Sequence, residues 1–406
     1  MHRLRRHRRA GLAFALGAGC AVVLTWSAAE HPALAESAPF TVTSSLPRWL
    51  APGGVLAVRG TAGPAETVTL FVGSVQRATT VGDDGTFLFR TRAPASGLYP
   101  IAVEVARDPV ERIEIGSLRV RALVLAAAGD VNLGDRVGTA ISAYGTRYPW
   151  LSVAPVLRQA DIAMTNLECS VSTRGSPVPG KQYTFRGRPG SLRTMAAYAG
   201  VDVVTVANNH SLDFGRLAFA DTLRYAHEYG MKTVGGGGNL AGARRPAIFL
   251  RGGLRIAILG YSDIRPPGFD AGSDYAGTAP AFPWYISSDV RKARAGGADV
   301  VVVYFHWGIE RTSTPTARQR SLAQVAFDAG AKVVLGAHPH ILQPIQRPRV
   351  NRIVAWSLGN FVFGANSPGT ASTGILRIRL GHAGVLSHGF RRARIGGIYG
   401  VQPRLL

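Results

Sequence analysis

Residues 299–310 read DVVVVYFHWGIE, and this stretch sets the fold class of the chain. Four consecutive valines without alternating polar residues are typical of a strand buried on both faces, as in a parallel sheet covered by helices. The run stops at His306 and Glu310, whose side chains can bind a metal or form hydrogen bonds. The stretch therefore predicts an α/β domain with polar functional groups where a strand ends.

Five further apolar runs flank this stretch, at residues 122–128, 162–165, 201–207, 332–337 and 352–357. Helical patterns at 215–229 and 316–330 separate some of these runs, and an alternation of strands with helices favours an α/β fold. Two more strands are expected at 374–380 and 385–395, around a glycine-containing turn. We expect this domain to cover residues 121–400.

Polar side chains follow each of the six apolar runs. In an open α/β sheet, ligands bind beyond the carboxyl ends of the strands because the loops converge there. Residues far apart in the sequence are therefore expected to meet at one site. The polar residues that follow the runs include Asp130, Asn132, Asn166, Glu168, Asn208, Asn209, His210, His306, Glu310, His338, His340 and Asn360.

These polar residues offer carboxylates, carboxamides and imidazoles, and they include no thiolate. Such donors suit Mn, Fe or Zn better than a metal that selects sulfur. Two ions about 3.5–4 Å apart would clamp a phosphoryl or carbonyl oxygen and activate a water molecule. The sequence therefore predicts a divalent metal cofactor (Mn, Fe or Zn), with one or two ions.

The segment His338-Pro339-His340 is the sharpest of these signals, because two imidazoles that flank a proline seldom serve packing. Proline disfavours the α region for the residue before it, so we expect an extended backbone that presents both rings on one side. Single residues elsewhere also have simpler explanations. His306 could be a hydrogen-bonded core histidine, and residues 208–213 could form a helix cap.

Residues 1–35 predict a targeting segment. Five arginines among the first ten residues precede an apolar stretch, and the tripeptide Ala-Leu-Ala at 33–35 predicts signal-peptide cleavage before Glu36. The apolar stretch is also nearly long enough to remain as a membrane anchor, with the arginines holding its start in the cytoplasm. We therefore expect an exported protein, at the cell surface or secreted, with tethering by the N-terminal segment as the alternative.

Short β-type runs alternate with turns between residues 38 and 120, and the segment Gly-Asp-Asp-Gly at 82–85 is a turn signal between two of them. This pattern predicts a small all-β domain of immunoglobulin-like type, built as a β-sandwich. The segment contains no catalytic constellation, so we expect it to act as a spacer or an adhesion module.

The chain is strongly basic, with a formal charge of +22 at pH 7. Long-range attraction favours anionic partners such as lipid, wall polymer or polyglutamate, although scattered arginines also fit biased codon usage. No basic stripe is interleaved with aromatic residues, so nucleic acid is not expected. Cys169 is expected to be a small buried hydrophobe, and after cleavage no second cysteine remains for an intramolecular disulfide.

Six motifs follow one another along the α/β segment: Gly129-Asp130, Asn166-Leu167-Glu168, Asn208-Asn209-His210 with Asp213 and Gly215, His306-Trp307-Gly308 with Glu310, His338-Pro339-His340, and Ser357-Leu358-Gly359-Asn360-Phe361. In this order they resemble the motifs of the CapA family of capsule-synthesis proteins, which is related to calcineurin-like metallophosphatases. The resemblance covers about residues 121–395 and does not include the β-rich segment. It implies a metallophosphatase-like αββα sandwich.

The resemblance also implies a set of metal ligands. Asn132 stands where metallophosphatases commonly have a ligand histidine, and Glu168 takes the place of their bridging aspartate. These departures point to weak binding, or to no ion at all, at one of the two metal positions. The implied ligands are Asp130, Asn132, Glu168, Asn209, His306, His338 and His340.

Catalytic and substrate-binding roles follow from the same resemblance. His210 would act as an acid or as a phosphate-binding donor, and Asp213 and Glu310 are the other expected catalytic residues. The expected substrate contacts are Asn208 and Asn360, together with Arg186, which is proposed because the basic segment at 183–189 is compatible with carboxylate or phosphate binding.

Membership of such a family implies a role in making, exporting or trimming an anionic surface polymer such as poly-γ-glutamate, beside membrane-associated synthase partners. The metal-dependent hydrolase or transferase is the leading hypothesis. A metal-dependent phosphoesterase is the first alternative. The second is a non-catalytic protein that binds the polymer or takes part in capsule export.

Overall fold

A computed structural model of the chain describes residues 38–406. The predicted targeting segment, residues 1–35, lies outside this range, so its cleavage and its anchoring role stay predictions. None of the helices in the described part of the chain has the length and apolarity that crossing a bilayer requires.

Two antiparallel sheets form between residues 41 and 120, and side chains from both share one apolar core. Alternate residues of each strand are buried, because successive side chains of a strand point to opposite faces. One sheet has the order β1 (Thr41–Val42), β2 (Val55–Thr61), β5 (Thr86–Arg92), and the other has the order β4 (Val75–Thr80), β3 (Thr67–Val72), β6 (Gly97–Val105), β7 (Glu111–Val120). The pairings alone do not identify an immunoglobulin-like domain, which stays a prediction.

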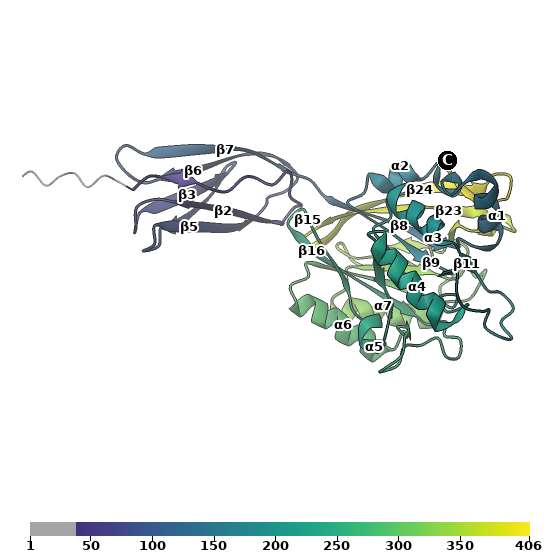
Figure 1. The fold of residues 1–406 in the computed structure, drawn as a ribbon. Helices are drawn as coiled ribbons and strands as arrows, with labels where there is room; N and C mark the ends of the chain where they lie inside the picture. Colours follow the sequence, from purple (N-terminus) through teal and green to yellow (C-terminus); the bar gives the residue numbers. More distant parts are fainter. Residues whose placement is uncertain (1–37) are drawn as a thin grey trace, which may run out of the picture. The chain divides into compact units, whose positions relative to one another are not determined.

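The rest of the chain is a mixed α/β structure with two larger sheets (Figure 1). The first has the order β13 (Lys232–Val234), β12 (Val203–Thr205), β9 (Ile162–Leu167), β8 (Leu123–Val131), β23 (Ser372–Gly381), β24 (Gly384–Gly396), β25 (Gln402–Leu405), and β22 (Asn360–Val362) also pairs with β8. Strands β12, β9 and β8 are parallel, whereas β23 and β24 continue the sheet in antiparallel fashion.

The second large sheet contains the valine run at its centre. Its order is β15 (Ala247–Arg251), β16 (Leu254–Ser262), β18 (Val300–His306), β19 (Val333–Ala337), β21 (Ile353–Ala355), β20 (Ile345–Gln346). Strands β16, β18, β19 and β21 are parallel, and every residue of β18 is buried. The six predicted strands are therefore present, but they divide equally between two sheets.

Helices cover the outer faces of both large sheets, which gives αββα layers (Figure 1). Apolar side chains from the inner faces of the two sheets form one core between them. On the first sheet lie α1 (Asp135–Tyr144), α2 (Ala154–Arg158), α3 (Pro189–Ala197) and α4 (Gly215–Glu228); on the second lie α6 (Pro283–Ala295) and α7 (Ala317–Ala329). The shorter elements are η1 (Tyr148–Trp150), α5 (Leu240–Ala243), α8 (Pro368–Ala371), β10 (Ser170–Val171), β11 (Arg186–Gly187), β14 (Gly236–Gly237) and β17 (Gly277–Thr278).

Gly129 allows β22 to approach β8 just before the first motif carboxylate. The Asp130 backbone N–H donates to the Gly359 carbonyl at 2.9 Å. A Cβ atom on Gly129 would lie 1.8 Å from that same carbonyl oxygen. Only glycine therefore fits here. Because it has no side chain, β22 can pair with β8, and Asn360 lies beside Asp130 in the sheet.

Replacing Gly129 with alanine is expected to lower the free energy of unfolding by about 2 kcal/mol or more, because backbone must shift to remove the overlap. Gly389→Ala is the matched control, since a Cβ atom there meets nothing within 4 Å. Urea unfolding of both variants measures the difference. Equal stability of the two variants would contradict the close approach.

Asp221 of α4 holds the loop that follows β10. It accepts hydrogen bonds from Arg174 at 2.6 and 2.9 Å and from the Ser172 hydroxyl at 2.6 Å. The Arg174 hydrogen bonds, aided by those of Ser172 and Arg224, hold the pKa of the Asp221 carboxyl well below its usual range. Because the folded pKa lies below the unfolded value, this stabilisation is present at neutral pH and is lost as the pH falls.

At pH 7 the free energy of unfolding of wild type is therefore expected to be larger than that of Asp221→Asn. The difference between the two free energies should shrink below about pH 4, because carboxyl groups of the unfolded chain take up protons there. Urea unfolding at pH 7 and pH 3 measures the margin. The exposed Asp274→Asn substitution serves as the control. A margin that grows on acidification would show that Asp221 is not held in its charged form.

Candidate metal centre

The carboxyl ends of the two large sheets meet at a cluster of buried polar side chains. Asp130 of β8 and His306 of β18 are both completely buried. Between them lies Asn166 of β9, whose Nδ2 is 2.8 Å from Asp130 Oδ1 and 3.2 Å from His306 Nδ1. Just behind the cluster, the Tyr304 hydroxyl donates to the Ala128 carbonyl at 2.9 Å. This hydrogen bond joins the two sheets and fixes the separation of their strand ends.

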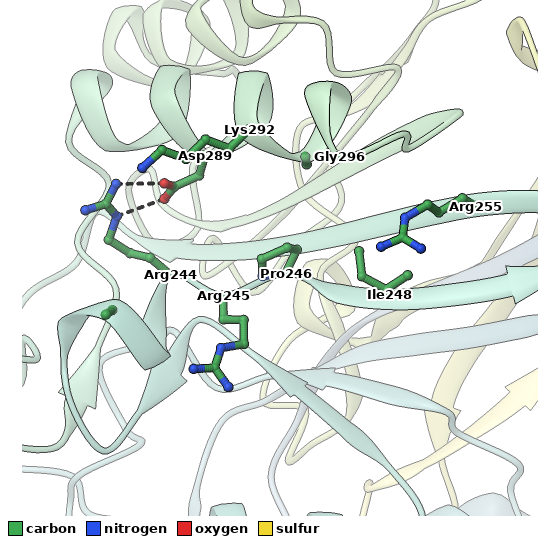
Figure 2. A pocket seen from close by; sticks show the side chains of 10 residues that line it. Arg244, Arg245, Pro246, Ile248, Arg255, Asp289, Lys292 and Gly296 are labelled. Atoms are coloured by element: carbon green, nitrogen blue, oxygen red, sulfur yellow. Dashed lines mark hydrogen bonds and ion pairs between the residues drawn. The ribbon is translucent and has the colours of Figure 1, made fainter. Parts of the chain in front are cut away.

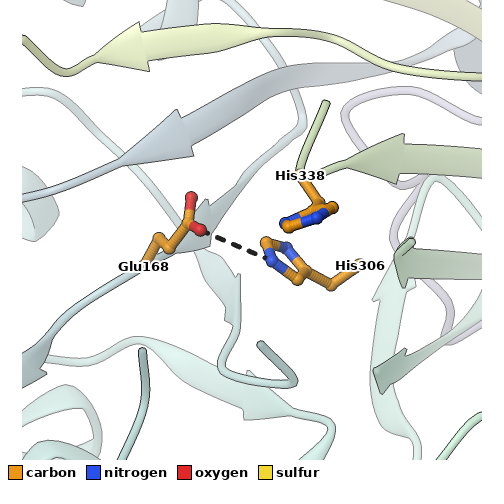
Figure 3. A group of neighbouring side chains, drawn as sticks. All are labelled: Glu168, His306 and His338. Carbon is orange, nitrogen blue, oxygen red and sulfur yellow. Dashed lines mark ion pairs between the residues drawn. The ribbon is translucent and has the colours of Figure 1, made fainter. Parts of the chain in front are cut away.

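Glu168 is the least satisfied group of the cluster. Its Oε1 lies 3.4 Å from His306 Nε2, and His338 lies beside the same imidazole (Figure 3). Within residues 38–406, neither carboxylate oxygen of Glu168 has a hydrogen-bond partner, and neither does His338 Nδ1. Buried polar atoms are normally hydrogen-bonded, and an unpaired buried carboxylate is costly. A cation at this place would satisfy all three atoms.

Three overlapping groups of side chains in the described part of the chain have ligand atoms within 4.8 Å of one another. Glu168, His338 and His340 each belong to two of these groups, so the groups form one continuous centre. Carboxylate and imidazole donors together suit a divalent transition metal. The groups are Glu168, His306 and His338; Glu310, His338 and His340; and Asp130, Glu168 and His340.

Burial makes two of the imidazoles suitable as neutral ligands. It lowers the pKa of His306 well below its usual value, and the nearby His338 adds to the effect. Burial and the charge of His340 lower the pKa of His338 to about 3. Both rings are therefore neutral at pH 7, which is the form that binds a metal. Burial, with Asp130 nearby, raises the pKa of Glu168 well above its usual value.

His340 has the opposite behaviour. Burial opposes its charged form, yet the carboxylates of Glu168 and Asp130 raise the pKa of His340 to about 10. Its Nδ1 lies 3.4 Å from Asp130 Oδ2 and 2.9 Å from Asn360 Oδ1. Without a metal this ring is thus the cation that offsets the neighbouring carboxylates. Binding a metal through His340 would release its proton.

The extended backbone predicted for His338-Pro339-His340 is wrong. His338 has a φ of 93° and His340 a φ of 58°, in a region that residues other than glycine rarely adopt. Two hydrogen bonds explain the curled path: the His338 N–H donates to Asp130 Oδ2 at 3.3 Å, and the Arg311 N–H donates to the Pro339 carbonyl at 2.8 Å. The two imidazoles still lie close, with centroids 5.8 Å apart. Strained backbone of this kind gathers at functional sites.

His210 belongs to a hydrogen-bonded group beside the metal-ligand cluster. Its Nδ1 lies 2.7 Å from Asp213 Oδ2 and 3.0 Å from Lys181 Nζ. Lys181 also forms an ion pair with Asp213 and donates to the Asn209 carbonyl at 2.6 Å. Burial lowers the pKa of His210, although Asp213 opposes the shift. The neutral ring is therefore held in place by a buried carboxylate and an ammonium group.

Lys181 is a site residue that the sequence reasoning misses. It is one of only four lysines in a chain whose other basic side chains are mostly arginines, and this rarity is the only sequence signal for it. Asn166, which follows a predicted strand, also belongs to the site because it bridges Asp130 and His306.

Two half-buried phenylalanines contact the His210 group and the metal-ligand cluster. The Phe185 ring is 4.3 Å from the His210 ring, and it meets Phe363 edge-on at 5.7 Å. The Phe363 ring in turn lies 5.1 Å from His340. The two phenylalanines therefore give the site an apolar surface that contacts both polar groups.

Three further predicted residues lie at the cluster. Asn209 Oδ1 is 2.7 Å from His306 Nε2, so both can face the same cation. Asn360 contacts His340 through its side-chain oxygen. Glu310 is exposed, but its carboxylate lies within the group formed with His338 and His340.

Three other predicted residues have different surroundings. Asn208 is fully buried; its Nδ2 donates to the Asn166 side chain and the Leu167 carbonyl, so a substrate contact does not fit it. Asn132 Oδ1 accepts from the Gly134 N–H at 2.8 Å, which makes it a turn-forming residue. Arg186 is exposed, and its guanidinium lies over the Phe214 ring at 4.2 Å. Asn208 and Asn132 thus take part in local structure that a motif pattern does not reveal, whereas the substrate contact of Arg186 stays a prediction.

Comparison with solved structures finds low similarity. The NAD nucleotidase of Haemophilus influenzae is 10% identical with a TM-score of 0.36, covering 70% of this chain and 53% of that chain. The 5′-nucleotidase of Candida albicans is 11% identical with a TM-score of 0.39, covering 69% of this chain and 52% of that chain. Likenesses at this level decide nothing about the chain.

Comparison with curated relatives is more informative. The "Capsule biosynthesis protein CapA" of Bacillus anthracis is 30% identical over 264 residues, 64% of this chain and 64% of the relative. The "PGA biosynthesis protein CapA" of Bacillus subtilis is 31% identical over 259 residues, 62% of this chain and 66% of the relative. The chain thus spans slightly less than two thirds of these relatives. The model of the family described as "Bacterial capsule synthesis protein PGA_cap" matches residues 124–365, which is more than half of the chain, and the chain therefore belongs to that family.

Proposed function

We propose that the chain is an exported, metal-dependent hydrolase or transferase of metallophosphatase type that acts on an anionic surface polymer such as poly-γ-glutamate. One observation carries the proposal. The Glu168 carboxylate is buried with no hydrogen-bond partner in the described part of the chain, while ligand atoms of His306 and His338 lie within reach of a shared cation. A bound metal would satisfy both carboxylate oxygens and remove the cost of burying them.

The donor set fits Mn, Fe or Zn. Asn132 is the weakest of the predicted ligands, because its side-chain oxygen already accepts the Gly134 N–H in a turn. The residues that would hold one or two ions are Asp130, Glu168, Asn209, His306, His338 and His340, with Glu310 at the exposed side. A bound ion would supply Lewis acidity toward a carbonyl or phosphoryl oxygen of the substrate.

His210 is the residue that we expect to move a proton. Asp213 and Lys181 both contact its Nδ1, which leaves Nε2 as the atom that can face a leaving group. The lowered pKa of His210, caused by burial, keeps the ring neutral until a substrate or a water supplies a proton. Asp213 orients the ring and would stabilise its protonated form.

An anionic polymer is the substrate class that the charge and the relatives favour. A formal charge of +22 attracts polyanions over long distances. The two Bacillus relatives are named for capsule and PGA biosynthesis, and we extend that role to this chain. Membrane-associated synthases are the expected partners.

The predicted organisation of the chain supports a place outside the cell. Residues 1–35 would direct export and then be removed or act as an anchor. The β-sandwich, which we assign to the immunoglobulin-like class over residues 38–120, would act as a spacer in front of the catalytic domain at 121–400.

The metal requirement can be tested with Glu168→Gln, which keeps the shape and removes the charge. We expect bound Mn or Zn to fall about tenfold or more, because a carboxylate ligand is lost. We also expect the metal-free variant to be at least as stable as wild type, since an unpaired buried acid is removed. Elemental analysis and thermal unfolding with EDTA measure these effects, with Glu228→Gln on the surface of α4 as the control. Unchanged metal content would overturn the metal centre.

His210→Gln is expected to separate proton transfer from metal binding. The variant should lose about a hundredfold in turnover while it keeps its metal, because His210 lies outside the three metal-ligand groups. Turnover is measured with poly-γ-glutamate and with 4-nitrophenyl phosphate, each with and without Mn, and the exposed His227→Gln is the control.

The two substrates distinguish the alternatives. Cleavage of the polymer supports the proposal, whereas hydrolysis of the phosphate ester alone would replace it with a phosphoesterase. Polymer binding without turnover on either substrate would identify a non-catalytic capsule protein.

A further inference from the structure

A basic pocket lies on the outer face of the second large sheet, between β15, β16, α6 and the segment that follows α5. Its volume is about 400 Å³, within the range of small-molecule sites. Residues of the pocket include Arg244, Arg245, Pro246, Ile248, Arg255, Asp289 and Lys292 (Figure 2). None of the motif residues lines it.

The pocket is separate from the metal centre. Arg255 lies near the start of β16, whereas Ser262, the last residue of that strand, pairs with His306. Seven residues of extended strand correspond to about 20 Å. A ligand in this pocket therefore does not contact the metal-ligand side chains.

The positive charges of the pocket exceed its negative charge. Asp289 is the one carboxylate among its lining residues, and it accepts hydrogen bonds from Arg244 at 2.7 and 2.8 Å and from the Tyr261 hydroxyl at 2.9 Å. The Asp289 carboxylate is thus occupied by Arg244 and Tyr261. In the described part of the chain, no side-chain hydrogen bond or ion pair is formed by Arg245, Arg255 or Lys292.

Arg255 is the least satisfied side chain of the pocket. Its Nε is buried and has no hydrogen-bond partner among residues 38–406. The nearby Asp299 does not serve it, because that carboxylate accepts from the Arg255 backbone N–H at 2.8 Å and pairs with His382 Nδ1 at 2.6 Å. The rest of the Arg255 guanidinium is only part-buried and lines the pocket, and a planar guanidinium binds carboxylates through two parallel hydrogen bonds.

The arrangement of charges indicates the kind of ligand. In Figure 2, Arg255 lies toward one end of the pocket and the Arg244–Asp289 pair toward the other, with Pro246 between them. Lys292 lies beside that pair. Cations at both ends with an apolar centre suit a chain that carries acid groups on short aliphatic spacers.

We infer that this pocket is a second binding site for a carboxylate-rich oligomer, which would hold the polymer at a distance from the metal centre. This inference rests on the proposed function for the identity of the polymer. Two points of attachment on one polymer chain raise its effective concentration at the reactive site.

The test is the binding of a fluorescently labelled oligo-γ-glutamate to the full chain, followed by anisotropy in the presence of EDTA. The double variant Arg255→Gln, Lys292→Gln is expected to weaken binding about tenfold or more. The control Arg291→Gln, Arg349→Gln removes the same charge at exposed positions outside the pocket, and it should weaken binding by less than about twofold. Circular dichroism checks that all variants are folded.

Two further measurements make the outcome decisive. Wild type that binds the oligomer at this pocket but turns over neither poly-γ-glutamate nor 4-nitrophenyl phosphate would refute the proposed function and leave this site standing. Equal weakening by the two double variants would overturn the pocket in favour of general charge attraction. Displacement of the oligomer by inorganic pyrophosphate at lower concentrations than by unlabelled oligo-γ-glutamate would overturn the carboxylate ligand.

Discussion

A carboxylate buried between two sheets without a hydrogen-bond donor is the constraint on which this structure depends. Glu168 lies at the end of β9, completely buried, with Asp130 close enough to raise its pKa. Two neutral imidazoles and the cationic His340 surround it. No packing advantage explains such a group, whereas a cation would convert it from a source of instability into a ligand.

The double-sheet architecture makes this constraint possible. Each sheet is covered by helices on one face and by the other sheet on the second face, so its parallel strands are apolar along their whole length. The polar residues can only be accommodated where these strands end. The Tyr304 hydroxyl on Ala128 and the close approach at Gly129 then fix the distance between the ends of the two sheets.

The sequence predicts much of the fold because its strongest signals are local. The valine run became β18, and the helical patterns at 215–229 and 316–330 match α4 and α7 closely. Helix α7 even carries its own boundary signals, a capping box at Thr316 and a left-handed Gly330. The division of the six strands between two sheets has no such local signal, and only the family resemblance suggested it.

The site is less predictable than the fold, since its geometry depends on contacts distant in sequence. The curled backbone of residues 338–340 arises from Asp130, more than two hundred residues earlier, and a rule based on the neighbouring proline misses it. Lys181 lies outside every motif and reaches His210 through the tertiary fold alone. Asn208 shows the opposite case: it belongs to a motif, yet its side chain holds the local backbone through a hydrogen bond to the Leu167 carbonyl. A motif indicates that a residue matters, but it does not distinguish a residue that supports the fold from one that takes part in the reaction.

The metal centre and the basic pocket each contain a buried polar group without a hydrogen-bond partner in the described part of the chain, an acid in the first and a guanidinium in the second. Beside His306, the two carboxyl oxygens of Glu168 lack a hydrogen-bond partner within the described residues, and near the start of β16 the buried Arg255 Nε lacks one as well. Sequences that fold well usually satisfy such groups internally, and departures from this rule concentrate at functional sites. The two groups belong to separate regions of the α/β domain, Glu168 just after β9 of the first sheet and Arg255 near the start of β16 in the second, so that substitutions at one leave the surroundings of the other unchanged.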